Sequence, residues 1–509
     1  MRRTVTIKLL AIFVLMWTVT SPAHVRADED ADRDSRPKTA TPIKHLVVIF
    51  DENNSFDHYF GTYPFATNPP GEPEFHAKPD TPLPNGLTTA LLQHNPNPIN
   101  PFRLDPSQNE TCDNDNHYSD EQKAFNGGLM NMFSITAAPS AGCTQFFAPN
   151  LEMGYYDGNT VTALWNYAQN YAMSDNFFDT EFGTTVMGHL NLISGQTHGS
   201  TSADIKGKIV NGSVIANVQP ALDDCPGATP HISMTGTNVG DLLNAANVTW
   251  GWFYGDFGAV SFSGGTATCV AEYNSHYDPF QYYASTTNPH HLPPSSVAMI
   301  GKADQANHQY DLTSFWNALA NGNLPAVSFL KAPVTNTGHP SDSSPLAEQE
   351  FLVNTINELE RSPYWRDMAI VIAYDDSDGW YDHVMGPIVN QSNDPANDAL
   401  LGPTGLCGTP QPGAYLDRCG YGERLPFLVI SPFAKRNYID HSINDTTSIL
   451  RFIEDNWGLG RIGDQSFDAL SGTILGMFDF DEHDDHRGDR DAESRRLFLD
   501  PTTGEPTGW

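Results

Sequence analysis

Residues 368–378 have the sequence MAIVIAYDDSD, a run of apolar side chains that ends abruptly in carboxylates. The run from Met368 to Tyr374 lacks the polar alternation of a half-exposed strand, so it predicts a strand with both faces covered. In sheets of this kind the functional groups collect beyond the carboxyl ends of the strands. The acidic cluster that begins at Asp375 is therefore a candidate functional site.

Strands and helices alternate around this stretch. Such alternation is typical of an α/β fold, and we expect a three-layer αβα sandwich with a mostly parallel central sheet. Residues 200–310 are rich in Gly, Ser, Asn and His and are expected to form an insertion or cap. The further elements that the pattern predicts are strands at 43–50, 326–330 and 425–430 and helices at 161–173, 348–359 and 446–456.

The N-terminus has the features of an export signal. Three basic side chains among the first eight residues precede Leu9–Val19, an apolar stretch too short to span a bilayer. Residues 25–27 then place small side chains at the −3 and −1 positions of a cleavage site. We expect an exported protein, secreted or periplasmic, without a stable membrane anchor. The predicted organisation is a signal peptide at 1–27, a leader at 28–42, the main domain at 43–478 and an acidic tail at 479–509.

The net charge limits the possible binding partners, and the cysteine content predicts disulfides. Lys and Arg number 27 against 61 Asp and Glu, a net charge of −34, which excludes a nucleic acid as the main partner and electrostatic docking on an anionic membrane. Six cysteines in an exported chain predict disulfides. Pairing of sequence neighbours would join 112–143, 225–269 and 407–419, although the sequence alone does not choose the pairing.

Two polar clusters follow predicted strands and contain ligands suited to a cation. Glu52 and Asn53 follow the strand at 43–50 and offer two oxygen ligands, although an Asx-type turn explains them as well. The second cluster places four carboxylates and one histidine within residues 375–383, where they repel each other unless a cation compensates them. The alternative for this cluster is a solvated acidic loop.

Hydroxyl and imidazole groups complete the candidates. Thr184 and Thr185 lie in a turn with Gly183, where a metal-ionised hydroxyl can attack phosphorus, although a threonine in such a turn is usually structural. Single histidines in turns are also more often structural than catalytic. The chain contains no nucleophile-elbow, P-loop, zincin or dinucleotide-binding motif, which excludes those enzyme classes.

In order along the chain, these motifs resemble the bacterial phosphoesterase family that includes acid phosphatases and phospholipases C. The resemblance runs from about residue 43 to the end, and its first two signatures are highly specific. It implies a fold similar to alkaline phosphatase, which agrees with the α/β prediction. The motifs that carry it are ENNSFDHYFG at 52–61, YDDSDGWYDH at 374–383, GYGERLP at 420–426 and DPTTGEP at 500–506.

The resemblance also implies a site: one divalent metal ion and a hydroxyl nucleophile. The nucleophile turn departs from the family pattern, because its prolines are missing and its hydroxyl belongs to a threonine; Thr184 would serve if the turn is shifted by one residue. One histidine of the family pattern matches His117, although an alignment shifted by one residue would place Asn116 there instead. The implied metal ligands are Glu52, Asn53, Thr185, Asp375 and Asp376, and the implied catalytic residues are Thr185, His339, His276 and His117.

The implied function is a secreted, metal-dependent phosphoesterase with a phospho-threonine intermediate, of phospholipase C type. The substrate would be a small molecule or a phospholipid. The alternatives are an acid phosphatase acting on phosphomonoesters and a non-catalytic secreted protein that binds a metal or ligand. A choline head group needs an aromatic or acidic cage, for which Trp250, Trp252, Tyr282 and Tyr283 are candidates, although core packing explains them equally well.

Overall fold

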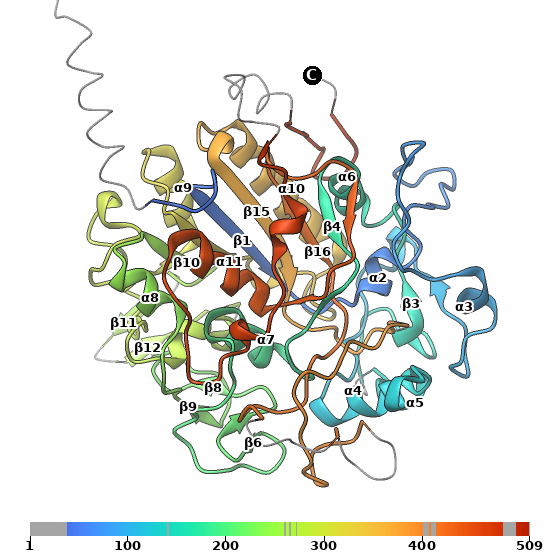
Figure 1. Ribbon diagram of the computed structural model, residues 1–509, viewed down its shortest axis with the longest axis horizontal. Helices are drawn as coiled ribbons and strands as arrows, with labels where there is room; N and C mark the ends of the chain where they lie inside the picture. Colours follow the sequence, from blue (N-terminus) through green and yellow to red (C-terminus); the bar gives the residue numbers. More distant parts are fainter. Residues whose placement is uncertain are drawn as a thin grey trace, which may run out of the picture. The chain divides into compact units, whose positions relative to one another are not determined.

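The apolar run at 368–374 forms β15 (Met368–Tyr374) of an eight-stranded sheet (Figure 1). The strand order is β13-β10-β14-β1-β15-β16-β4-β17. Only β16 (Phe427–Ile430) runs antiparallel to both of its neighbours. The prediction of an α/β fold with a mostly parallel sheet is therefore confirmed. The other strands are β13 (Gln309–Asp311), β10 (Trp250–Tyr254), β14 (Val327–Lys331), β1 (His45–Asp51), β4 (Ala172–Ser174) and β17 (Tyr438–Asp440).

The computed structural model describes residues 38–507 apart from 140–141, 259–260, 264–265, 271, 401–406, 409–413 and 482–494. The predicted signal peptide, residues 28–37 of the predicted leader and most of the acidic segment at 479–491 therefore lie outside the described residues. Among the residues that are described, no helix combines the length and the apolar character needed to cross a membrane.

Helices cover the sheet because each presents an apolar side to it. Every residue of β1 and β15 is buried, as expected when both faces of a sheet are covered. Four longer helices form two contacting pairs, α7 with α11 and α10 with α6, and α11 crosses in front of the sheet in Figure 1. Their bounds are α6 (Thr162–Asn170), α7 (Thr185–Ser194), α10 (Pro345–Arg361) and α11 (Thr447–Trp457).

The longest of these helices shows how the sequence sets its ends. Ser344 caps α10 by accepting a hydrogen bond from the backbone N–H of Ala347, and Pro345 occupies the first helical position, where it loses no hydrogen bond. Leu352 and Ile356 lie one turn apart on the buried face. The helix predicted at 348–359 is thus present and extends by one turn toward its capping serine.

The segment at 200–310 divides between the central sheet and an excursion from it. Its strand β10 joins the sheet beside β14, because Trp250–Tyr254 is a fully buried apolar run. The excursion contains short strand pairs outside the sheet. These are β6 (Ile209–Val210) with β7 (Ser213–Val214), β8 (Gln219–Pro220) with β9 (His231–Ile232), and β11 (Ser261–Ser263) with β12 (Thr266–Thr268).

All six cysteines form disulfides between sequence neighbours: Cys112–Cys143, Cys225–Cys269 and Cys407–Cys419. The predicted disulfides are thus present, and the structure selects the local pairing that the sequence left open. The six cysteines themselves lie outside the strands of the central sheet, and the loop closed by Cys225–Cys269 includes β10 of that sheet.

Candidate metal centre and catalytic cavity

The two acidic motifs meet where β1 and β15 end. The strands are parallel neighbours with Asp51 opposite Tyr374, so the residues that follow them leave the same edge of the sheet. The backbone N–H of Asn53 donates to Asp375 Oδ1 at 3.0 Å, and Asn53 adopts a left-handed φ of 57° that turns the chain there. Four side chains of this edge are buried side by side: Glu52, Asn53, Asp375 and Asp376.

The N-terminus of α7 brings the candidate nucleophile to the same place. Thr185 is the first residue of the helix, and its Oγ1 donates to Asp376 Oδ2 at 3.4 Å. One turn later Gly188 packs directly against the backbone of Asp375, where any Cβ would overlap the carbonyl group. A residue without a side chain is therefore required for the helix to approach the strand end.

Three buried oxygens of this cluster have no hydrogen-bond partner: Glu52 Oε2, Asn53 Oδ1 and Asp375 Oδ2. Burial and the neighbouring Asp375 carboxylate raise the pKa of Glu52 well above its ordinary range, and the same two causes raise the pKa of Asp376. Carboxylates in this position need a compensating cation to stay ionised. The oxygen-rich donor set therefore fits a divalent metal ion.

Two basic side chains that the sequence analysis missed flank these carboxylates. Lys331, the last residue of β14, is fully buried; its ammonium pairs with Glu52 and donates to the Phe50 carbonyl at 3.0 Å. His189 Nε2 lies 3.7 Å from Glu52 Oε1, and its Nδ1 lies 2.9 Å from the carbonyl oxygen of Thr185. The four-residue spacing between Thr185 and His189 was a usable signal, because it places both on one helix face.

Glu121 ties the nucleophile turn to the loop after β15. It lies on α4 (Tyr118–Phe125), is buried, and accepts hydrogen bonds from the Ser377 hydroxyl and from the backbone N–H of Gly183, both at 2.8 Å. Burial raises the pKa of Glu121 to about 8. The sequence contained no signal for this residue, because a single glutamate in an amphipathic helix is usually solvated.

A cavity of about 470 Å³ opens beside these groups. Thr184, Thr185 and Asn53 contribute to its wall, so the candidate nucleophile is accessible from it. Among the described residues that line it there is no Trp, Tyr or Phe. The remaining lining residues are Asp113, Asn114, Asp115, Asn116, His117, Ala138, Pro139, Gly207, Lys208, Ala216, Asn217 and His339.

The three candidate histidines occupy different positions. His339 lines the cavity, with its Nε2 3.3 Å from Asn53 Nδ2. His276 is not among the lining residues; its Nδ1 lies 2.9 Å from Gln219 Nε2, and burial lowers its pKa to about 3.

The side chains of Asn116 and His117 lie in different surroundings. The His117 ring pairs with Asp115 at 2.6 Å and is 67% exposed at the cavity rim. Asn116 instead donates from Nδ2 to Asp376 Oδ1 at 3.0 Å. Asn116, and not His117, therefore contacts the carboxylate cluster.

The four aromatic residues considered for a choline cage are all part of the core. Trp250, Trp252, Tyr282 and Tyr283 are at most 1% exposed, and none lines the cavity. The Tyr282 hydroxyl donates to the Val218 carbonyl at 2.6 Å. Core packing therefore accounts for them.

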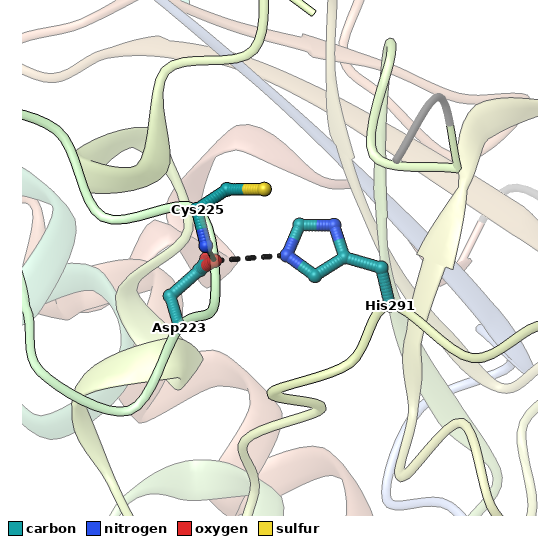
Figure 2. Close-up of side chains that lie close together, drawn as sticks. All are labelled: Asp223, Cys225 and His291. Carbon is teal, nitrogen blue, oxygen red and sulfur yellow. Dashed lines mark hydrogen bonds and ion pairs between the residues drawn. The ribbon is translucent and has the colours of Figure 1, made fainter. Parts of the chain in front are cut away.

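A second close group of potential ligands, Asp223, Cys225 and His291, is already satisfied (Figure 2). The sulfur of Cys225 is bonded to Cys269. Asp223 Oδ1 accepts hydrogen bonds from His291 Nε2 at 2.9 Å and from the Cys225 backbone N–H at 2.6 Å. The group cross-links the loop around this disulfide and leaves no thiolate for a metal.

The chain is similar in sequence to proteins named phospholipase C. The chain is 25% identical to a non-hemolytic phospholipase C of Pseudomonas aeruginosa, over 90% of this chain and 60% of that protein, so it spans about 60% of that relative's length. It is also 25% identical to phospholipase C A of Mycobacterium tuberculosis, over 87% of this chain and 78% of the relative. A plant relative, non-specific phospholipase C6 of Arabidopsis thaliana, is 25% identical over 78% of this chain and 63% of its own.

Among solved structures, a protein in the alkaline phosphatase superfamily from Vibrio parahaemolyticus aligns with a TM-score of 0.30 and 10% identity, covering 71% of this chain and 74% of its own. The sequence profile of the Phosphoesterase family matches residues 43–460, which include both acidic motifs, the nucleophile turn and His339. The chain therefore belongs to the Phosphoesterase family.

Proposed function

We propose that the protein is a metal-dependent phosphoesterase of phospholipase C type that forms a covalent phospho-threonine intermediate. The observation that carries the proposal is the position of Thr185. Its Oγ1 lies 3.4 Å from Asp376 in a buried carboxylate cluster, at the wall of a cavity. Membership of the Phosphoesterase family and relatives named phospholipase C support the reaction class.

The metal ligands in this proposal are those that share the strand ends. Glu52, Asn53, Asp375 and Asp376, together with the Thr185 hydroxyl, would hold one divalent ion. Such an ion, when bound, lowers the pKa of a hydroxyl and neutralises charge on phosphate oxygens. The unpartnered oxygens of Glu52, Asn53 and Asp375 support this ligand set.

The protein's own groups supply the remaining chemistry. Thr185 Oγ1 attacks phosphorus in line, forming an Oγ–P bond as the bond to the ester oxygen breaks. The positive end of the α7 dipole stabilises the phosphate there. His339 lines the cavity and donates a proton to the departing alcohol; it then takes a proton from the water that hydrolyses the phospho-threonine.

Export and substrate class complete the proposal. The signal predicted at 1–27 and three disulfides support a secreted or periplasmic enzyme, because disulfides persist in oxidising compartments. The substrate is a phospholipid or a small phosphate ester. Phosphomonoester hydrolysis is the second candidate, favoured by the absence of an aromatic ring among the described residues of the cavity wall.

The test is a substrate panel measured before and after chelation. p-Nitrophenyl phosphate, p-nitrophenyl phosphorylcholine and phosphatidylcholine in detergent micelles report monoester, diester and lipid cleavage. We expect hydrolysis that stops after metal removal and returns with added divalent ions. Acid quenching during turnover should trap one phosphoryl group on the wild type and none on Thr185→Ala. Hydrolysis by a fully demetallated protein would contradict the proposal, and no hydrolysis with any ion would favour a non-catalytic binding protein.

A further inference from the structure

Lys208 is a cation in the wall of the catalytic cavity that has no acidic partner. Its Nζ donates to the carbonyl oxygen of Asn217 at 2.9 Å, and within the part of the chain that the structure describes no carboxylate forms an ion pair with it. The fully buried cations Lys331 and Arg424, in contrast, are paired with carboxylates. In a chain with net charge −34, an unpaired lysine inside the cavity leaves local positive charge available to a ligand.

The same lysine is connected to the nucleophile helix. Asn217, whose carbonyl accepts from Lys208, also accepts through its Oδ1 a hydrogen bond from the backbone N–H of Val186 at 3.1 Å. Val186 directly follows Thr185 in the first turn of α7. The segment around β6 and β7 therefore holds Lys208 next to the helix end at which the phosphate is expected.

Asn114 supplies a second group aimed at a ligand. Its side chain is only 3% exposed and lines the same cavity, yet neither its Oδ1 nor its Nδ2 has a hydrogen-bond partner. Burying an amide without partners is costly. A bound polar group that hydrogen-bonds this amide would remove the cost.

Two aspartates also line the cavity, and their surroundings differ. Asp115 is paired with the ring of His117 at 2.6 Å, and Asp113 lies in a close group with His339 and Asp378. No Trp, Tyr or Phe occurs among the described lining residues to face a quaternary ammonium. A trimethylammonium group would therefore meet unpaired Lys208 without an aromatic cage.

We infer that Lys208 and Asn114 form an anion subsite of the catalytic cavity, which selects substrates carrying negative charge beyond that of a choline phosphodiester. This inference rests on the proposed phosphoesterase function. The extra charge can come from the dianion of a phosphomonoester or from an anionic head group. In both cases the ammonium of Lys208 binds phosphate or head-group oxygens through charge-assisted hydrogen bonds.

Four variants test the subsite: Lys208→Met, Lys208→Arg, Asn114→Ala, and Lys206→Met as the matched control. Lys206 is an exposed lysine two residues away that does not line the cavity. Lys208→Met should lower kcat/KM for p-nitrophenyl phosphate about tenfold, mainly through KM, as expected for one lost charged contact. It should change kcat/KM for p-nitrophenyl phosphorylcholine by less than about twofold, whereas Lys208→Arg should restore monoester activity.

Two further substrates identify which group of the substrate carries the negative charge that Lys208 binds. Neutral detergent micelles that contain either phosphatidylglycerol or phosphatidylcholine compare anionic and zwitterionic head groups without a charged surface. A loss confined to phosphatidylglycerol assigns the subsite to the head group, and a loss on p-nitrophenyl phosphate assigns it to the scissile dianion. Asn114→Ala should show the same selective pattern as Lys208→Met.

An equal loss on every substrate, or no loss on either anionic substrate, would overturn the inference. If the wild type hydrolyses nothing, the proposed function fails, and calorimetric binding of inorganic phosphate then tests the subsite by itself. Weaker phosphate binding by Lys208→Met than by Lys206→Met would support the subsite. Equal binding by these two variants would refute it.

Discussion

Replacing Gly188 by alanine tests how the structure holds the nucleophile against the metal centre. An added Cβ would lie 2.7 Å from the carbonyl carbon of Asp375 and 2.9 Å from its Cα. The carbonyl oxygen of Asp375 would lie closer still, and ordinary contacts begin at 3.4 Å, so the helix and the strand end must separate by at least about 0.7 Å. Backbone atoms make up this contact, and no flexible side chain can move away to relieve it.

The displacement acts directly on the reacting group. Thr185 lies one turn before Gly188 on the same helix and moves with it, while its partner Asp376 is fixed to the end of β15. A misplacement of about 1 Å can cost about 10²-fold in rate. We therefore expect kcat for Gly188→Ala to fall by roughly 10- to 100-fold. The overpacking should also cost about 1–3 kcal/mol of the free energy of unfolding.

The measurements are kcat on the best substrate of the panel, metal content by mass spectrometry and thermal unfolding. Gly476→Ala is the matched control, because an added Cβ there meets nothing closer than Asp440 Oδ1 at 3.6 Å. That variant should keep wild-type activity. Gly188→Ala with kcat within about twofold of the wild type, in a protein of unchanged stability, would refute the close-approach argument.

Three further predictions concern the site residues. Thr185→Ala should lower kcat by several orders of magnitude, and Thr185→Ser should retain substantial activity. Thr184→Ala should lower kcat much less. If Thr184→Ala is instead the more damaging change, the nucleophile is Thr184. Asp376→Asn should lower the bound metal measured by mass spectrometry, and wild-type metal content would remove it from the ligand set. His339→Gln should lower kcat for esters with poor leaving groups by about 10²-fold or more, whereas His117→Gln should keep kcat near the wild-type value. Equal losses for the two variants would mean that His339 is not the general acid.

The sequence by itself was sufficient to predict the two central strands and the acidic motif that follows each of them. The runs at 43–50 and 368–374 are too apolar to be solvated on either face, and the carboxylates that end them cannot be buried without compensation. Parallel neighbours end at the same edge of a sheet, but the structure is what shows that β1 and β15 are neighbours and that Glu52 therefore lies near Asp375. From the sequence, this ligand set was implied only by the family resemblance.

Residues brought in by distant elements were not predictable in the same way. Lys331 and Glu121 are single charged residues in otherwise ordinary elements, and only the packing of β14 and α4 around the strand ends brings them to the site. The aromatic segment at 250–254 was expected in an insertion, but it forms β10 of the central sheet, since periodicity describes a strand and not its neighbours.

The sequence determined which strands are buried, which residues carry oxygen ligands and where a hydroxyl can follow a glycine turn, because these depend on local composition and spacing. Only the tertiary structure decided that Asn116 rather than His117 contacts Asp376, that His189 and Lys331 flank the carboxylates, and that Lys208 remains unpaired in the cavity. Those facts depend on side-chain direction and on contacts between segments up to hundreds of residues apart, which one-dimensional patterns do not contain.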